Sequence, residues 1–223
     1  MTQPDTHAAT RQIATADRPL AASARAQVLV RALTSVDRDR LLTHFLALDD
    51  EDRLLRFGQA APDHVIEKYV RGIDFASDTV FGVFDHQLQL VGVGHLAYLP
   101  TDGNGRTAEF GASVLESARG QGIGTQLFER AAIRSRNAHV TTLYIHCLAR
   151  NATMMHIARK SGMKIERDRG EADAWLSLAP ADHHTIVTEM LQEQAAVLDY
   201  GMKRLMRHAQ TWLKSMLSHA ASA

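Results

Sequence analysis

Apolar residues recur along the middle of the chain with two different periods, which predict alternating strands and helices. Alternating or β-branched runs predict strands at 28–33, 79–85, 87–99, 107–116 and 140–148, and a strand hairpin over 163–178. Apolar residues spaced by three or four predict helices after residue 37, around 65–70, over 125–138 and over 151–160. The order β-α-α-β-β-β-α-β-α-β-β predicts a mixed α/β layer rather than regular βαβ repetition.

Residues that favour caps and turns mark the ends of these elements. Asp37 is predicted to cap the first helix, and the aspartate pair at 49–50 to end it. Gly162 suits the position just after the 151–160 helix. A tight turn near 85–86 predicts an antiparallel hairpin, and the DGNG stretch at 102–105 is a strong turn signal.

From 182 to 217 the pattern becomes that of a long amphipathic helix, or of two helices meeting at Gly201. Its stripe consists of Val187, Leu191, Gln194, Leu198, Met202, Leu205, Ala209, Trp212 and Met216. The favoured interpretation is that this stripe covers the domain's own surface. The alternative is an interface with a partner, such as a homodimer. The polar face lacks the cationic excess of a membrane-surface helix.

Composition and charge narrow the class of protein. The 223 residues include 25 Lys plus Arg and 25 Asp plus Glu, and this balance argues against a nucleic-acid binder. The single cysteine, Cys147, excludes an internal disulfide framework and fits a reducing compartment. Residues 1–27 have no continuous apolar run and are predicted to be a flexible tail rather than a secretory signal. We therefore expect a cytoplasmic protein with no membrane partner, since its apolar runs are too short to span a bilayer.

The stretch ARGQGIGTQ at 118–126 places three alternating glycines immediately before a helix, which is typical of a phosphate-binding loop. A P-loop would need Gly-Lys followed by Ser or Thr, and the chain has no such sequence. A dinucleotide-binding G-x-G-x-x-G fails because Thr125 stands where the third glycine belongs.

A third motif does fit, the [Q/R]-x-x-G-x-[G/A] signature running from Arg119 to Gly124. Successive N–H groups at the start of the following helix, together with the helix dipole, form an anion site. Glycines let the backbone approach a ligand closely, and Arg119 adds a forked donor for phosphate oxygens.

This signature resembles that of the GNAT N-acetyltransferase superfamily, in which the loop holds the pyrophosphate of acyl-coenzyme A. The resemblance covers roughly 28–178 and looks closest to the acetyltransferase domain of bacterial protein-lysine acetyltransferases. It is carried by FLALDDEDRLLRFG (45–58), YVRGIDFASDTVFGVFD (69–85), AEFGASVLESARGQGIGTQL (108–127) and RNATMMHIARKSGM (150–163). It implies a mostly antiparallel mixed sheet flanked by helices over 28–179. The apolar pattern adds 180–223 as a helical extension, which has no counterpart in the resemblance.

The resemblance also implies acetyl-CoA as co-substrate and a set of residues that bind it. A strand ending in a bulge at Ser113, Val114 and Leu115 would pair with the pantetheine amides. Asn151, followed by Gly162-Met163 at the family's spacing, would contact the pantetheine arm, although it could also simply cap its helix. The implied cofactor-binding residues are Val114, Leu115, Arg119, Gly120, Gln121, Gly122, Ile123, Gly124, Thr125 and Asn151.

Acetyl transfer to an amine needs a base, oxyanion donors and a proton for the leaving thiolate. For the base we choose Glu109, which strand alternation places with Gly111 and Ser113 on one face, opposite Phe110. An ion pair with Arg106 would be a purely structural role for it. Backbone N–H groups at Val114 or Leu115 would serve the oxyanion.

The proton donor is unassigned, because Ala158 occupies the position where many family members have a tyrosine. Solvent or Tyr144 could replace it. Cys147 is predicted to be a small buried residue. His95 and His146 are predicted to be structural, although one of them could line the acceptor pocket, and His183-His184 are predicted to begin the last helix. No metal-binding spacing occurs, so no metal is expected.

These features leave three classes of function. The first is an enzyme that moves an acetyl group from acetyl-CoA to an amine, either a protein lysine or a small molecule. The second is a non-catalytic acyl-CoA sensor acting through the C-terminal helix. The third is an interaction protein built on that helix alone, whose glycine loop would bind no coenzyme A.

Overall fold

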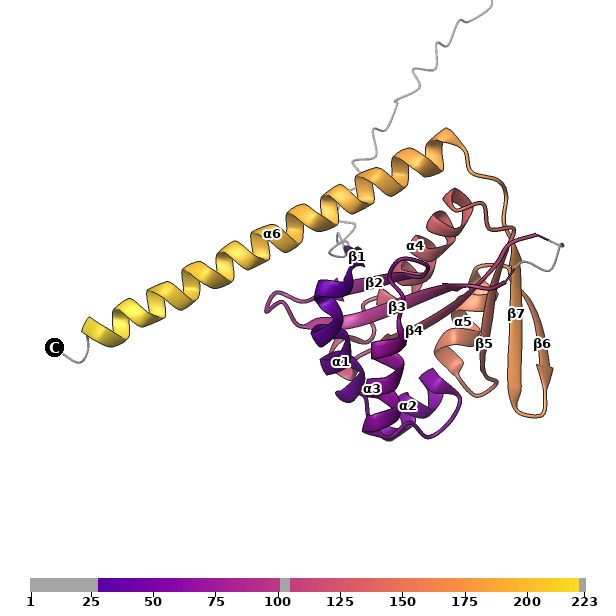
Figure 1. The fold of residues 1–223 in the computed structure, drawn as a ribbon, viewed down its shortest axis with the longest axis horizontal. Helices are drawn as coiled ribbons and strands as arrows, with labels where there is room; N and C mark the ends of the chain where they lie inside the picture. The colour runs from indigo at the N-terminus through magenta and orange to yellow at the C-terminus, as the bar shows by residue number, and fades with distance from the viewer. Residues whose placement is uncertain (1–27, 101–104, 221–223) are drawn as a thin grey trace, which may run out of the picture.

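The structure is a computed structural model that describes residues 28–100 and 105–220. The predicted tail at 1–27 and most of the predicted turn at 102–105 lie outside the described residues. The described part forms a mixed α/β fold in which one sheet is packed between helices, and a long C-terminal helix lies along one side (Figure 1).

The sheet has seven strands in the order β1-β2-β3-β4-β5-β7-β6. The strands are β1 (Arg31–Leu33), β2 (Thr79–Phe84), β3 (Leu90–Tyr98), β4 (Thr107–Val114), β5 (Thr142–Leu148), β6 (Lys164–Asp168) and β7 (Glu171–Ser177). All neighbours are antiparallel except β4 and β5, which are parallel. The mostly antiparallel sheet, the 85–86 hairpin turn and the final hairpin are therefore confirmed.

Helices cover both faces of the sheet. They are α1 (Arg38–Leu46), α2 (Asp50–Phe57), α3 (Asp63–Gly72), α4 (Ile123–Asn137), α5 (Ala152–Lys160) and α6 (His183–Ala220), with 3-10 turns η1 (Ser35–Asp37) and η2 (Glu116–Ala118). On β4, Phe110 packs edge-on against Phe128 of α4, whereas a side chain at Gly111 would meet Arg56 of α2. Helices α1–α3 thus lie on one face of the sheet and α4 on the other, and the core fills both layers.

The helix predicted after Asp37 forms as α1, but a second helix that was not predicted follows it closely. Helix α1 ends at Leu46, and α2 begins at Asp50 with Asp49 as its cap, accepting from the Asp52 N–H at 2.7 Å. The aspartate pair therefore starts the second helix, whereas the first ends three residues earlier with Ala47 as its C-cap. Asp37 is the N-cap residue of α1, as predicted, but its carboxylate accepts from Arg31 and from the Thr34 N–H rather than from an N–H group of the helix.

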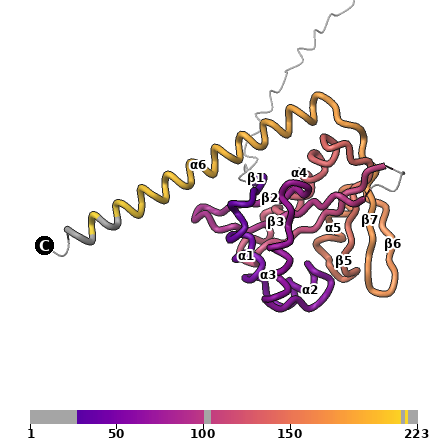
Figure 2. The backbone as a smooth tube through the Cα atoms, viewed as in Figure 1, coloured from indigo at the N-terminus to yellow at the C-terminus, as the bar shows by residue number. Residues whose placement is uncertain are grey.

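The parallel strands β4 and β5 part company after a short stretch. They pair only from Thr107 with Thr142 to Glu109 with Tyr144. Beyond this point β4 stays in register with β3 through Val114, and β5 stays in register with β7 through Leu148. A gap thus opens between two halves of one sheet. Figure 2 traces the backbone through both halves.

Helix α6 runs without a break through Gly201, which decides between one helix and two. Its first half docks on the domain through charge. Arg130 of α4, whose side chain is only 4% exposed, lies 3.1 Å from Glu189 and 3.0 Å from Glu193. Glu193 also accepts from the Ala32 N–H on edge strand β1 at 3.2 Å, so it covers a sheet edge that would otherwise be open.

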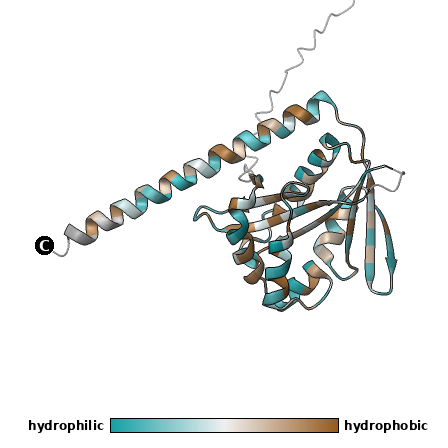
Figure 3. Cartoon of the chain, in the orientation of Figure 1, coloured by the Kyte–Doolittle hydropathy of each residue, from teal (hydrophilic) through white to brown (hydrophobic). Residues whose placement is uncertain are grey.

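The favoured interpretation of the α6 stripe, that it covers the domain's own surface, is wrong. Apolar residues recur along the part of α6 that extends past the sheet (Figure 3), and their side chains are exposed. More than half of each of these side chains is exposed: Val187, Leu191, Leu198, Met202, Leu205, Trp212 and Met216. The predicted pairing of two chains through this helix stays a prediction. Among the helices described, none is long and apolar enough to cross a membrane.

Replacing Arg130 with Met should lower the free energy of unfolding by about 2–4 kcal/mol, because Glu189 and Glu193 lose their buried partner. Urea unfolding monitored by circular dichroism measures this change. Arg134→Met is the matched control, since Arg134 is 43% exposed and lies 3.9 Å from Glu189. The control should lose less than about 1 kcal/mol. Equal losses for the two variants would contradict a docking role for Arg130.

Candidate functional site

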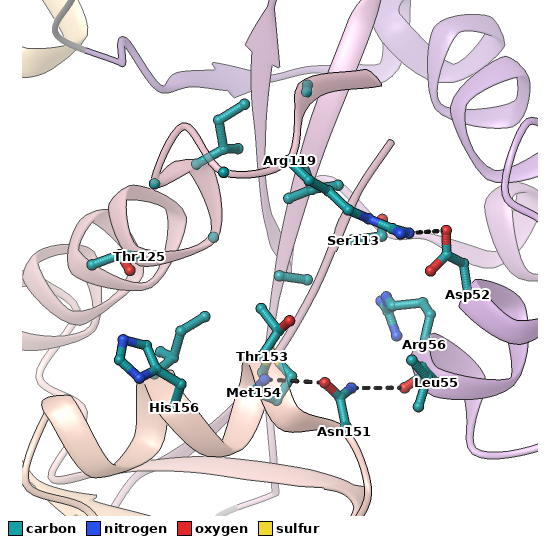
Figure 4. A pocket seen from close by; sticks show the side chains of 18 of the residues that line it. Asp52, Leu55, Arg56, Ser113, Arg119, Thr125, Asn151, Thr153, Met154 and His156 are labelled. Carbon is teal, nitrogen blue, oxygen red and sulfur yellow. Dashed lines mark hydrogen bonds and ion pairs between the residues drawn. The ribbon is translucent and has the colours of Figure 1, made fainter. Parts of the chain in front are cut away.

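A cleft of about 320 Å³ opens where β4 and β5 separate. Eight of the residues predicted to bind a cofactor line it: Val114, Arg119, Gly120, Gly122, Ile123, Gly124, Thr125 and Asn151. Figure 4 shows side chains from α2, α4 and α5 converging on this space. Leu115 and Gln121 do not line it, because Leu115 is buried and Gln121 faces solvent.

The glycine loop has the backbone conformation that its sequence predicts. Gly120 and Gly122 adopt φ values of +77° and +80°, which only glycine accepts at low cost. Gly122 is the N-cap of α4, and the first helical hydrogen bond is made by the Gln126 N–H to the Gly122 carbonyl. The N–H groups of the preceding turn therefore have no partner within the helix and face the cleft with the positive end of the helix dipole.

The open edge of β4 also presents donors, though not the predicted pair. The Leu115 N–H donates to the Val91 carbonyl at 2.9 Å, so it is not available to a ligand. Because N–H groups alternate along a strand, those of Ala112 and Val114 point the other way, toward the gap. The expected bulge at 113–115 is absent from the β3–β4 pairing, and the gap arises from the divergence of β5 alone.

Helix α2 forms one wall of the cleft. Three polar contacts join it to the opposite wall, which consists of the glycine loop and the start of α5. The Asp52 carboxylate pairs with Arg119, and Glu51 pairs with Arg150. The Leu55 carbonyl accepts from the Asn151 amide at 3.4 Å. The two ion pairs are partly exposed to water, so each contributes at most about 1 kcal/mol.

Asn151 caps its helix, as the simpler of its two readings predicts. Its side-chain oxygen accepts from the Met154 N–H at 3.0 Å, and its amide nitrogen points across the cleft to α2 (Figure 4). Asn151 is only 7% exposed, and it lines the cleft. One side chain therefore fixes the start of α5 and offers a donor to the cleft.

Glu109 lines a second cavity that adjoins the cleft on the side of α2. The two spaces share Leu55, Arg56, Ala112 and Met154. Glu109 makes no ion pair with any described residue, whereas Arg106 donates to the Ala138 carbonyl and stacks on Tyr98. The structural alternative for Glu109, an ion pair with Arg106, is therefore wrong, and its carboxylate faces the cavity.

Beside Glu109, a hydrogen-bonded cluster lies on β5 and β7. Asp173 accepts from the Tyr144 hydroxyl and lies 2.8 Å from the Nδ1 atom of His146. Burial, and then this hydrogen bond, raise the pKa of Tyr144 above its usual range. The hydrogen bond to Asp173 raises the pKa of His146.

The other residues considered in the sequence analysis, Cys147, His95 and Ala158, are buried or held by neighbouring side chains. Cys147 is buried, and burial raises the pKa of its thiol. His95 is a structural residue, held between Tyr69 and Asp78. Ala158 is buried in α5. In the described part of the chain, no three His, Cys, Asp or Glu side chains are grouped to hold a metal ion.

His44 connects the core to the β4 edge of the site. Its Nδ1 atom donates to the Leu90 carbonyl at 2.9 Å, so Nε2 must accept the Ser113 hydroxyl at 2.8 Å. Burial lowers the pKa of His44 to about 4, and the nearby Arg56 charge adds to this effect. The neutral ring thereby links α1 to β3 and β4 and fixes the position of β4.

A comparison with protein families identifies the domain. Residues 27–164, more than half of the chain, match the model of the acetyltransferase (GNAT) domain. The chain belongs to the GNAT acetyltransferase family. Proteins of this family use acetyl-CoA as acyl donor, and the match supports acyltransferase activity. Among curated proteins, no sequence matches the chain significantly.

Solved structures share the fold at low sequence identity. The GNAT domain of S. lividans PAT superposes with a TM-score of 0.59 at 19% identity, over 67% of this chain and 89% of that one. A ribosomal-protein-alanine N-acetyltransferase from Brucella melitensis has a TM-score of 0.53 at 18% identity, over 68% and 100%. A Salmonella typhimurium protein assigned as an acetyltransferase, solved with its cofactor acetyl-CoA, has a TM-score of 0.53 at 13% identity, over 70% and 96%.

Sequence reasoning missed the contribution of α2 to this GNAT site. Asp52, Leu55 and Arg56 line the cleft, and none of them was a candidate. The signal was present in the chain: DEDRLLRF repeats apolar residues at helical spacing directly after a capping aspartate. The aspartate pair at 49–50 also suits the end of the first helix, and this hides the start of the second.

The low pKa of His44 predicts a pH-dependent stability. In the unfolded chain His44 has a pKa near 6.5 and becomes protonated below that pH, whereas in the folded chain it stays neutral down to about pH 4. The free energy of unfolding therefore falls as the pH drops from about 6.5 to about 4. The loss should reach about 3 kcal/mol. Urea unfolding between pH 7 and pH 4.5 should show a flatter pH dependence for His44→Gln than for the wild type. The exposed-site control His64→Gln should keep the wild-type slope. Identical slopes for all three proteins would contradict the assignment.

Proposed function

We propose that residues 28–179 form an acyltransferase domain that moves an acetyl group from acetyl-CoA to a primary amine. The amine attacks directly, with donor and acceptor bound at the same time. The extension from 180 onward is a separate structural addition to this domain.

The parting of β4 and β5 is the observation that carries the proposal. It leaves the Ala112 and Val114 N–H groups facing an open, narrow cleft, where an extended chain of amides can replace the missing strand pairing. At one end of the cleft, the glycine loop and the start of α4 offer N–H groups to a pyrophosphate. Glu109, on the same strand as Ala112 and Val114, directs its carboxylate into the cavity that adjoins the cleft.

In the proposed reaction, Glu109 removes a proton from the acceptor ammonium, directly or through a water molecule. The freed lone pair of nitrogen then attacks the thioester carbonyl carbon, forming a C–N bond and placing negative charge on oxygen. N–H groups on β4 stabilise that charge. The C–S bond breaks as the carbonyl re-forms, the amide nitrogen loses its second proton, and the departing thiolate gains one.

The thiolate proton comes from solvent or from His146 rather than from Tyr144. The Tyr144 hydroxyl is held by Asp173 and has a raised pKa, so it is a poor acid. His146 lines the Glu109 cavity, and its raised pKa keeps a larger fraction of the ring protonated near neutral pH.

Replacing Glu109 with Gln should lower kcat by about 10²- to 10⁴-fold at pH 7, because the base is lost. Activity should recover partly at high pH, where the free amine needs no base. The Kd for acetyl-CoA should stay within about twofold. Thiol release from acetyl-CoA with a panel of primary amines measures the rate, and calorimetry measures the Kd.

Glu166→Gln is the matched control, since Glu166 lies on β6 and is paired with Lys164. It should retain wild-type rates. A wild-type rate for the Glu109 variant at pH 7 would remove this residue from the reaction. Acetyl-CoA binding without turnover by the wild type, for every amine tried, would contradict the enzyme assignment.

Arg119 should strengthen the binding of acetyl-CoA, and Asp52 should weaken that binding by competing for the Arg119 guanidinium. In the structure the guanidinium of Arg119 is paired with the Asp52 carboxylate rather than with a phosphate. Arg119→Met should weaken acetyl-CoA binding about 10- to 100-fold, the value of one charge-assisted hydrogen bond. Asp52→Asn should leave the affinity equal or higher, because it removes a competitor for the same cation. Weaker binding by Asp52→Asn, measured by calorimetry, would contradict this arrangement.

A further inference from the structure

Arg56 occupies the boundary between the acetyl-CoA cleft and the Glu109 cavity. It projects from α2 into the cleft (Figure 4), and it lines both spaces. Its guanidinium lies flat over Gly111 of β4, where a Cβ atom would come within 3.0–3.2 Å of the guanidinium carbon and its terminal nitrogens. The absence of a side chain at 111 therefore makes room for this cation.

The charge of Arg56 has no counter-charge among the described residues. Its Nη2 atom donates to the Tyr69 hydroxyl at 2.7 Å, and its Nε atom is buried without a partner. Nη1 makes no hydrogen bond to any described residue either. By contrast, Arg53, Arg119 and Arg130 each pair with a carboxylate. A cation in a confined site normally has an anionic partner, so the missing one is expected from a ligand.

The guanidinium is held in place by a rigid aromatic box. The rings of Phe45, Phe57 and Tyr69 lie 5.8, 5.2 and 5.5 Å from its central carbon. Tyr69 accepts from Arg56 and so donates its own proton to the Nδ1 atom of His95, 2.7 Å away. His95 in turn contacts Asp78 through Nε2 at 3.1 Å. The Arg56 guanidinium is therefore pre-organised by its neighbours before a ligand binds. Such pre-organisation favours recognition of one specific group.

Glu109 and Gly111 lie two residues apart on the same face of β4. Two residues of a strand span about 7 Å. Glu109 and the guanidinium over Gly111 therefore line one cavity from strand positions roughly 7 Å apart. A molecule that carries an ammonium group and a carboxylate on the same carbon atom or on neighbouring ones matches these two charges in sign, and with one hydrogen bond at each end it can reach both.

We propose that the acceptor is an amino carboxylic acid, whose carboxylate accepts from Nη1 of Arg56 while its amine lies against Glu109. This inference rests on the proposed acetyltransferase function and specifies its substrate class. Arg56 is here a specificity-determining residue. It fixes the substrate end that does not react, and so positions the amine for attack.

Pairs of amines that differ only by a carboxylate test the proposal. Suitable pairs are L-lysine and cadaverine, L-phenylalanine and phenethylamine, L-tyrosine and tyramine, and L-histidine and histamine. With the wild-type protein, we expect kcat/KM for the best amino acid to exceed that of its decarboxylated twin by about 10- to 100-fold, the value of one charge-assisted hydrogen bond. Equal or better use of the decarboxylated twins, or of a lysine-containing peptide without a free carboxylate nearby, would overturn the proposal.

Arg56→Met should raise KM for the amino acid by about 10- to 100-fold more than for its decarboxylated counterpart, so that the preference disappears. Arg56→Lys, which keeps the charge, should retain part of the preference and covers the case in which the Met variant fails to fold. Arg71→Met, at a residue 71% exposed on α3, is the control and should change neither value. An equal loss for both members of a pair in both Arg56 variants would assign Arg56 to a structural or oxyanion role instead.

Calorimetry with acetyl-CoA distinguishes the two levels of failure. If acetyl-CoA does not bind the wild type, the proposed function fails, and the acceptor assignment fails with it. If acetyl-CoA binds but only carboxylate-free amines are acetylated, or none of the panel is, the donor site stands and the amino carboxylic acid assignment is overturned.

Discussion

Strands β4 and β5 pair for three residues and then part, and the rest of the site depends on that parting. Main-chain N–H and C=O groups that lose their strand partners must be paired some other way or remain open to a ligand. The division also splits the sheet into two halves, each held by its own antiparallel partners, β3 for one and β7 for the other. The gap is therefore a property of rigid elements and is formed before any ligand arrives.

Helix α2 converts this gap into an enclosed site. Its contacts with the opposite wall are two partly exposed ion pairs and one long hydrogen bond at Asn151, so they add little stability. The more durable attachment is Arg56, inserted among aromatic rings and lying over Gly111. The part of the wall that carries Arg56 is thereby rigid, whereas the part that carries Glu51 and Asp52 is held by contacts that a charged ligand can replace.

Local sequence signals were sufficient for most of the fold and for the glycine loop and helix cap that line the cleft. The glycine loop, the hairpins and the Asn151 cap each depend on conformational preferences of a few adjacent residues, which a sequence displays directly. The rest depends on contacts between distant segments. The Arg56–Gly111 contact, the occupied Leu115 N–H and the exposed stripe of α6 follow from packing and register, which periodicity alone does not specify. Helix α2 was missed because only residues 47–49 separate it from α1, and its capping aspartate also suits the end of a helix.

Thermal unfolding with acetyl-CoA, and with NADH and ATP as controls, tests the central claim that the gap between β4 and β5 is a coenzyme A site. At about 100 times its Kd, a ligand that binds only the folded state adds roughly 2.7 kcal/mol. For a chain of this size the melting temperature should rise by roughly 5–10 °C with acetyl-CoA and stay unchanged with the two controls. No rise at millimolar acetyl-CoA, or an equal rise with NADH or ATP, would contradict the claim.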